Sequence, residues 1–270
     1  MPQSKSPVQE LRDQLAGLLP PGQPYDPVVP AGHQQKALEA LGEEIAHERF
    51  YFVFNLMTCE LEHTRGVERW LGYSGKDFTV GRYLNCIHPG QSIQLNLIAG
   101  SMYRILCSGV FKLQFSTQRY ISFVGLRHNN GNYMLFKKTT SVFQYDRDNR
   151  LLAQLNVFDK MDDYENSPLK PRITEIQGLQ KEDFERAVFN MTLQNFMEKK
   201  YFSEKEFAVL KLYSGNEGIT TKELAEALNV QTTTINTYNK RILTKAKDIF
   251  THPFSEAREV AFYLKKEKIC

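Results

Sequence analysis

Long apolar runs are missing from this 270-residue sequence. No segment approaches the ~18 consecutive apolar residues that a membrane helix requires, and the opening MPQSKSPVQE lacks the apolar core of a signal peptide. Cysteine is also scarce, since the four cysteines form no CxxC pair and have no regular spacing. This pattern predicts free thiols in a reducing compartment and no zinc site. Together these absences predict a cytoplasmic protein without membrane contact.

Catalytic signatures are absent as well. The sequence has no GxSxG, no HExxH, no glycine-rich phosphate loop and no carboxylate pair with a spacing typical of acid-base catalysis. An enzyme is therefore not expected. The net charge is only +3, so any attraction to nucleic acid has to come from locally clustered bases. The composition, 41% hydrophobic and 24% charged, is that of a globular protein, and the length allows two ordinary domains.

Two helices separated by a break are predicted between residues 222 and 246. Thr220 and Glu223 have the spacing of a capping box at the start of the first helix, and Ser203 and Glu206 have the same spacing at the start of an earlier helix. The second helix begins at Thr232, and its apolar stripe consists of Ile235, Tyr238, Ile242, Ala246 and Ile249. The opposite face consists of Thr233, Asn236, Thr237, Lys240 and Thr244. Residues 227–247 include four bases and no acid, a composition that suits a helix beside phosphates and base edges.

A longer pattern surrounds these two helices. It comprises Phe202-Ser203-Glu204-Lys205-Glu206, Val209-Leu210, Gly215, Lys222-Glu223-Leu224-Ala225, Leu228, Thr234-Ile235, Ile242 and Lys245. Together these residues resemble the helix-turn-helix domain of LuxR-type bacterial regulators over residues 201–269. Two positions depart from that family, because Gln231 stands where Ser is usual before the recognition helix, and Tyr238 stands where His is usual.

The resemblance implies a sequence-specific transcriptional regulator that binds double-stranded DNA as a homodimer. The residues that it places at the major groove are Thr232, Thr233, Asn236, Thr237 and Lys240. The residues that it places near phosphates are Lys222, Arg241 and Lys245. The last helix, with apolar positions Ala257, Val260, Ala261 and Leu264, would be a dimer contact, although its pattern equally fits packing within the chain. The alternative function is an interaction module in which the helix-turn-helix dimerises without binding DNA.

Residues 49–160 change from strand patterns to helix patterns and back again. The predicted strands are Phe50–Leu56, Leu61–His63, Tyr120–His128, Tyr133–Tyr145 and Leu151–Phe158, with helices in residues 67–106. They predict an α+β domain with a five-stranded antiparallel sheet, ahead of the all-α domain. The order of elements, with Gly66-Val67-Glu68-Arg69-Trp70-Leu71-Gly72-Tyr73, Ile87-His88-Pro89 and His128-Asn129-Asn130-Gly131, resembles a PAS domain.

The signal sensed by such a domain stays unknown, because PAS domains hold haem, flavin, small metabolites or nothing, and many bind other proteins. A small molecule and a protein partner are both open here. The candidate cavity residues are Phe52, Phe54, Cys86, Leu97, Met102, Phe123 and Phe136, which would serve equally as plain core. Cys86 lacks the flanking residues of a flavin-adduct motif, and His88-Pro89 suits an ordinary helix start. No cofactor is predicted.

The flanking segments complete the predicted division of the chain. Residues 1–48 contain two short amphipathic helices around a proline-rich connector, and the first helix is either a weakly ordered tail or a helix that packs on a partner subunit. Residues 161–171, with Asp162-Asp163 and Pro171, are not expected to continue a strand or a helix. Phe184 then opens a linking helix that ends near Lys199. The predicted units are therefore 1–48, 49–160, 161–199 and 200–270.

Overall fold

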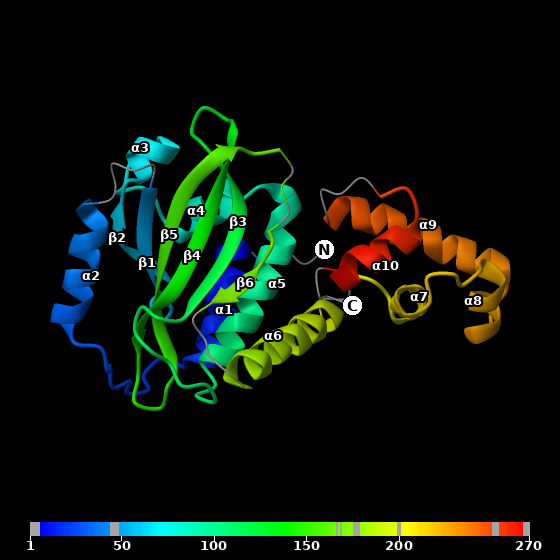
Figure 1. Ribbon diagram of the computed structural model, residues 1–270, viewed down its shortest axis with the longest axis horizontal. Coiled ribbons are helices and arrows are strands. Elements are labelled where there is room, and N and C mark those ends of the chain that lie inside the picture. The colour runs from blue at the N-terminus through cyan, green and yellow to red at the C-terminus, as the bar shows by residue number, and fades with distance from the viewer. Residues whose placement is uncertain are drawn as a thin grey trace.

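The computed structural model describes residues 6–43, 49–165, 167, 169–174, 179–198, 201–249 and 254–266. They form a domain built on an antiparallel sheet and a second domain of helices, with α6 (Leu179–Glu198) leading from one to the other (Figure 1). The predicted fold class, an α+β domain followed by an all-α domain, is confirmed. The predicted end of the linking helix near Lys199 lies outside the described residues. So does Cys270, one of the four cysteines predicted to be free thiols. None of the described helices has the length and apolar character needed to cross a membrane.

Within these residues the sheet has six strands in the order β2-β1-β5-β4-β3-β6, and every neighbouring pair is antiparallel. The strands are β1 (Arg49–Asn55), β2 (Glu60–Arg65), β3 (Arg119–Arg127), β4 (Tyr133–Tyr145), β5 (Leu151–Asp163) and β6 (Arg172–Thr174). The prediction of five strands is wrong by one, because a sixth strand, β6, pairs with β3 and forms the edge of the sheet. A strand of three residues is too short to show the alternation by which strands are predicted.

A second correction concerns residues 161–163, where the acidic composition predicted an end to regular structure. β5 instead continues to Asp163, because Asp162 and Asp163 pair with Leu135 and Met134 of β4. The side chains of these residues are exposed. The backbone hydrogen bonds of the hairpin therefore extend the strand although no apolar side chain is buried there.

Helices cover both faces of the sheet, with α1 (Pro7–Leu18), α4 (Val80–Cys86) and α5 (Pro89–Leu106) on one face and α2 (Ala31–Glu43) on the other (Figure 1). The central strand β1 is consequently buried on both sides. Its residues Phe50, Phe52 and Phe54 join the main core, whereas Tyr51 and Val53 join a smaller cluster with Leu38 of α2. A short helix, α3 (Val67–Leu71), follows β2.

The N-terminal helix packs on its own domain, which neither of the two predicted alternatives described. Leu15 is 2% exposed and Leu19 is 4% exposed, and both belong to the main core. Burying a leucine completely stabilises a fold by ~1.5–3 kcal/mol. The proline-rich connector then runs beside the end of β4, where the Val28 amide donates to the Tyr145 carbonyl at 2.9 Å. Residues 6–43 are therefore an integral part of the sheet domain.

α5 is the longest helix in the sheet domain, and its start follows the prediction for His88-Pro89. Nδ1 of His88 accepts a hydrogen bond from the Gly90 amide at 3.3 Å, and Pro89 is the first helical residue. The His88 ring lies 4.6 Å from each of the rings of Tyr133 and Tyr164, measured between centroids. Burial lowers the pKa of His88. This histidine is thus occupied in capping α5.

The second domain consists of α7 (Glu204–Gly215), α8 (Thr221–Ala227), α9 (Thr232–Ile249) and α10 (Ala257–Lys266). Its core is centred on Leu210, Ile242 and Leu264, which are completely buried. The second predicted capping box is present at α7, because Oγ of Ser203 accepts from the Glu206 amide and Glu206 accepts from the Ser203 amide. α7, α9 and α10 pack against one another, and α8 packs against α9.

Candidate DNA-binding face and sensor cavity

The helix pair predicted from residue 222 onward is formed by α8 and α9. The capping box of α8 is confirmed: Oγ1 of Thr220 accepts from the Glu223 amide at 3.3 Å, and the Glu223 carboxylate accepts from the Thr220 amide at 2.7 Å. That backbone hydrogen bond lowers the pKa of Glu223. The turn contains Asn229, whose φ is +50°. α9 begins at Thr232 as predicted, and the Gln231 carbonyl accepts from the Thr234 amide at 2.9 Å.

α9 has one buried face and one exposed face. Ile235, Ile242 and Ala246 are completely buried, and Tyr238 is partly buried against them. All five residues predicted to lie at the major groove are exposed, namely Thr232, Thr233, Asn236, Thr237 and Lys240. Lys222 and Arg241, predicted to lie near phosphates, are exposed as well. Figure 1 shows that α8 and the start of α9 occupy the end of the molecule farthest from the sheet.

Lys245 differs from the other predicted contacts because it forms an ion pair within the domain. Its Nζ lies 2.7 Å from Oε2 of Glu206, whose side chain is 3% exposed. Burial tends to raise the pKa of Glu206, but hydrogen bonds from Lys245 and from the Ser203 amide outweigh it, and the pKa is lowered. Lys245 therefore joins α9 to the start of α7. A phosphate contact by the same ammonium group stays a prediction.

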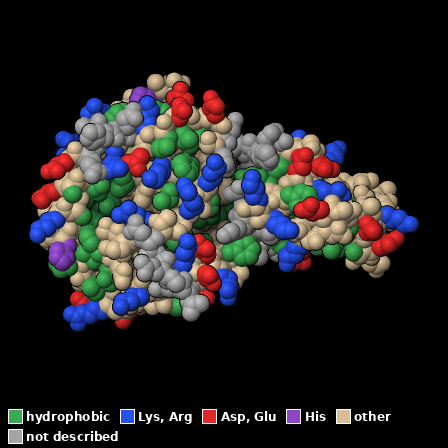
Figure 2. All heavy atoms as spheres, in the orientation of Figure 1, with side chains coloured by type: hydrophobic (Ala, Val, Ile, Leu, Met, Phe, Trp, Pro, Cys, Tyr) green, Lys and Arg blue, Asp and Glu red, His purple; other side chains and the backbone are tan. Residues whose placement is uncertain are grey.

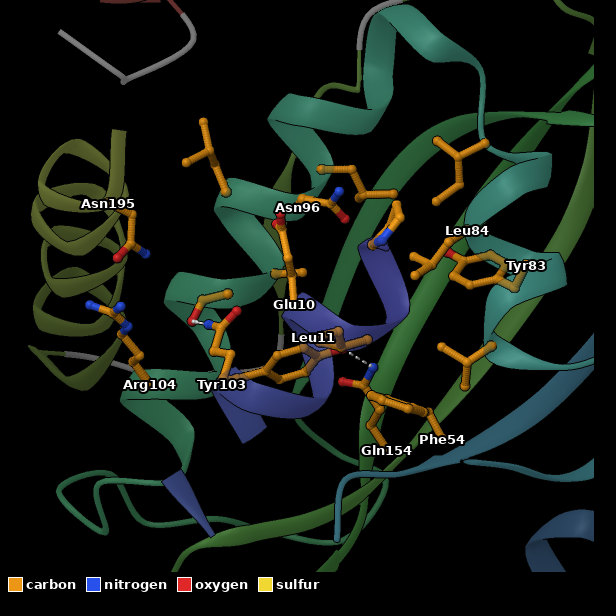
Figure 3. A pocket seen from close by; sticks show the side chains of 18 of the residues that line it. Glu10, Leu11, Phe54, Tyr83, Leu84, Asn96, Tyr103, Arg104, Gln154 and Asn195 are labelled. Atoms are coloured by element: carbon orange, nitrogen blue, oxygen red, sulfur yellow. Dashed lines mark hydrogen bonds between the residues drawn. The ribbon is translucent and has the colours of Figure 1, made fainter. Parts of the chain in front are cut away.

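The sheet domain contains a hollow of about 770 Å³ between the inner face of the sheet and the helices α1, α4 and α5. Figure 3 shows Tyr83 and Leu84 of α4, Phe54 of β1 and Tyr103 of α5 around this cavity, and α1 crosses it. The volume is typical of a small-molecule site. The cavity therefore satisfies the first requirement of a sensor, which is room for a ligand.

α1 is held across the cavity by a direct contact with α5. Nε2 of Gln14 donates to the Gly100 carbonyl at 3.1 Å. A Cβ atom at position 100 would lie only 2.8 Å from Nε2 of Gln14, so glycine permits this close approach. Glu10, Leu11 and Leu18 of the same helix also line the cavity. One wall of the cavity is thus built from the N-terminal helix.

Three of the seven predicted cavity residues line this hollow, namely Phe52, Phe54 and Leu97. The other four are Cys86, Met102, Phe123 and Phe136. Cys86 and Phe136 are completely buried in the core. Met102 lines a second, smaller hollow. Phe123 alternates with two inward residues of β3 and therefore lies on the opposite face of the sheet, beside Arg172.

Sequence reasoning missed the polar wall of this cavity. Lys138 of β4 and Asn156 of β5 line it and are 8% and 1% exposed. Gln154 also lines it, and its Nε2 donates to the hydroxyl of Tyr103 at 3.0 Å (Figure 3). A signal was available, because side chains two apart in a strand share a face. Asn156 is two residues from buried Phe158, and Lys138 is two residues from buried Phe136.

α5 joins the cavity to the second domain. Gly100 and Tyr103 line the cavity, whereas Oγ of Ser101 accepts a hydrogen bond from Nδ2 of Asn195 on α6 at 2.8 Å. Leu97, one turn earlier, packs into the core of the second domain together with Phe196. A displacement of α5 at the cavity would therefore disturb its contacts with α6 and with the helices of the second domain.

A comparison with protein families identifies the second domain. Residues 200–247 match the family described as bacterial regulatory proteins, luxR family. These residues are a LuxR-family helix-turn-helix domain. The match spans α7, α8 and most of α9, and it confirms the resemblance predicted from the sequence. A search of the curated proteins returned no match.

Solved structures similar to this chain are remote. An RNA-binding light-oxygen-voltage receptor is 13% identical, with 75% of this chain and 55% of that chain covered and a TM-score of 0.33. The phage VqmA–DPO complex is 13% identical, with coverages of 88% and 91% and a TM-score of 0.30. SdiA in complex with octanoyl-rac-glycerol is 13% identical, with coverages of 97% and 96% and a TM-score of 0.25. This chain thus spans about half of the receptor's length, and likeness at this level assigns neither a ligand nor a target to it.

The last helix of the second domain, α10, uses its apolar stripe within the chain. Ala257, Val260, Ala261 and Leu264 are all buried, and α10 packs on α7 and α9. Of the two roles predicted for this stripe, packing within the chain is confirmed. A dimer contact through α10 would use the opposite side of the helix, on which Phe262 is partly exposed and Lys266 is exposed.

On the face seen in Figure 2, acidic and basic side chains are interspersed over both the sheet domain and the LuxR-family domain. A net charge of +3 spread in this way gives little long-range attraction to a polyanion. Attraction to phosphates therefore depends on the local bases of α9 and on Lys222 at the start of α8.

Proposed function

We propose that this protein is a transcriptional regulator that binds a specific double-stranded DNA site through α9 and senses a signal or a partner through its PAS-like domain. The observation that supports it most strongly is the exposed outer face of α9 in a LuxR-family domain, because the helix has no acid between Thr232 and Lys247. A helix that only packs against a protein partner has no need of such a face. The dimerisation-only alternative therefore has less support.

The residues of α9 have distinct roles in this proposal. The amide of Asn236 can hydrogen-bond both N6 and N7 of adenine, and Lys240 can donate to O6 or N7 of guanine. The hydroxyl of Thr237 donates to the Thr233 carbonyl at 3.0 Å, which leaves its methyl group for contact with thymine. Lys222 and Arg241 would hold phosphates and set the register without reading sequence.

A single recognition helix reads few base pairs, so the protein would act as a homodimer. Two copies of α9 would occupy successive major grooves on one side of the duplex, with half-site centres ~34 Å apart. The dimer also provides a way to regulate binding, because a change in the relative orientation of the two LuxR-family domains alters the match to the half-sites. The contacts of α5 with α6 provide a route by which the cavity could cause that change.

The DNA-binding role is tested by selecting a preferred site from random duplex DNA and titrating it against variants of the full chain. Lys240→Ala should weaken binding to the selected site by ~5–150-fold, the cost of losing one good base contact, and leave random DNA almost unaffected. Lys205→Ala removes the same charge from an exposed position on α7 and is the matched control. Equal affinities of Lys240→Ala and the unaltered protein for the selected site would exclude this role for α9.

A further inference from the structure

The inner face of the sheet has a polar row where a buried surface would normally be apolar. Asn156 of β5 lies opposite Phe52 of β1 on one side and Thr140 of β4 on the other. Lys138 is two residues from Thr140 on the same face of β4, so Lys138 and Asn156 are diagonal neighbours. Both side chains line the cavity. The row therefore runs across the central strands, beneath the helices.

Lys138 is the most unusual member of this row. Its ammonium lies 5.7 Å from the ring centroid of Tyr83 and 6.0 Å from that of Phe158. Among the described residues, no carboxylate forms an ion pair with it. Burial lowers its pKa from 10.5 to about 8, so most of the population is still charged near neutral pH. Aromatic faces compensate a buried cation by only ~2 kcal/mol, less than burying an ion costs.

Two further polar groups at this place lack partners among the described residues. Nδ2 of Asn156 and Oη of Tyr83 are buried and form no hydrogen bond with any part of the chain that the structure describes, although Oδ1 of Asn156 accepts from the Thr140 hydroxyl at 3.0 Å. Buried polar groups in proteins are nearly always paired. Gln154, by contrast, is satisfied by Tyr103. The unpaired groups are therefore an ammonium, an amide N–H and a phenolic hydroxyl, all of which can donate, and the missing partner is an acceptor.

We propose that the cavity binds a small organic anion, with its anionic oxygen held by Lys138, Asn156 and Tyr83 and its apolar body against Phe52 and Phe54. This inference rests on the proposed sensing role of the PAS-like domain and specifies the chemistry of its ligand. Three donors around one charged oxygen group match the inventory of unpaired atoms. The two phenylalanines supply the apolar surface that most small-molecule sites contain.

The probes for the test are three carboxylates and their neutral amides: benzoate and benzamide, phenylacetate and phenylacetamide, and hexanoate and hexanamide. Binding to the full chain is measured by titration calorimetry and by ligand-observed NMR. At least one acid should bind tenfold or more tightly than its amide. Lys138→Met should lower the affinity for that acid by tenfold or more. Lys137→Met, which alters the next residue on the opposite face of β4, should leave this affinity unchanged. Tyr83→Phe removes only the hydroxyl group and should lower the affinity for the acid severalfold.

Equal binding of acid and amide, no binding of any acid at millimolar concentration, or unchanged binding by Lys138→Met would each overturn the proposal. A gel shift with the selected DNA, with and without the bound acid, separates this proposal from the proposed function. Acid binding that depends on Lys138 but leaves DNA affinity unchanged would support the ligand class and refute the sensing role. Acid binding that changes DNA affinity in the unaltered protein but not in Lys138→Met would support both.

Discussion

Replacing Lys138 by methionine should stabilise the sheet domain in the absence of ligand. Methionine keeps an unbranched side chain that is one atom shorter, and it removes a charge that is 8% exposed and has no anionic partner among the described residues. Because burial lowers the pKa of Lys138 from 10.5 to about 8, keeping it protonated in the fold costs ~3 kcal/mol at neutral pH, at ~1.36 kcal/mol per pKa unit. The expected gain is ~1–3 kcal/mol, because the lost cation–π contacts offset part of this penalty.

The pH dependence of this gain has a definite sign. The unfolded chain keeps the lysine proton up to pH 10.5, whereas the folded chain releases it near pH 8, so between these values the unfolded state binds more protons. The stability of the unaltered protein should therefore rise with pH across this window. The advantage of Lys138→Met should be greatest below pH 8 and fall toward zero near pH 10.5. Burial raises the pKa of the neighbouring Tyr83, so its hydroxyl stays neutral over the same window.

The assay is urea unfolding of the full chain, followed by the fluorescence of its single tryptophan. Trp70 lies in α3, so its signal reports the sheet domain and not the LuxR-family domain. Measurements at about pH 7 and about pH 9.5 should show the advantage falling by roughly half, as the linkage relation requires. Lys137→Met is the control and should change stability little at either pH. A Lys138→Met protein that is less stable than the unaltered one, or whose advantage does not vary with pH, would refute the reasoning.

Two further predictions concern the LuxR-family domain, and amide hydrogen exchange measures both. Lys245→Met leaves the buried carboxylate of Glu206 unpaired and should destabilise α7 and α9 by ~1–3 kcal/mol. Because the pKa of Glu206 is lowered from 4.5, the loss of stability caused by Lys245→Met should be full above pH 4.5 and should fade as the pH drops below this value. An equal loss of stability at about pH 3 would contradict this explanation. Thr220→Ala should cost the start of α8 ~1 kcal/mol by removing its N-cap. Thr244→Ala, an exposed change on α9, should leave α8 exchange unaltered, and equal effects would contradict the capping role.

The elements that the sequence predicted well are those with strong local signals. The capping boxes at Ser203 and Thr220, the apolar stripe of α9 and the aromatic run of β1 each fix an element within about a dozen residues. The exposed positions on α9 followed from the same periodicity. These predictions needed no information about what the element packs against.

The features that escaped prediction depend on contacts between distant segments. The packing of α1 on α5 joins Gln14 to Gly100, and the ion pair of Lys245 joins α9 to α7. The polar row was overlooked for a different reason. Lys138 follows Lys137, and two adjacent lysines suggest a solvated strand surface unless the alternation between faces is applied to each residue separately. The cavity prediction relied mainly on aromatic residues, although one of them, Phe136, is completely buried in the core.

The position of α1 changes where the sheet domain begins. By pattern alone the domain starts at Arg49 with the first strand, and a fragment for expression would be designed from there. Such a fragment would lack the leucines at positions 15 and 19 and would lose the wall of the cavity that α1 builds. A fragment of the sheet domain made for expression therefore has to include α1, and a fusion partner joined just ahead of Pro7 needs a linker long enough to leave this helix in place.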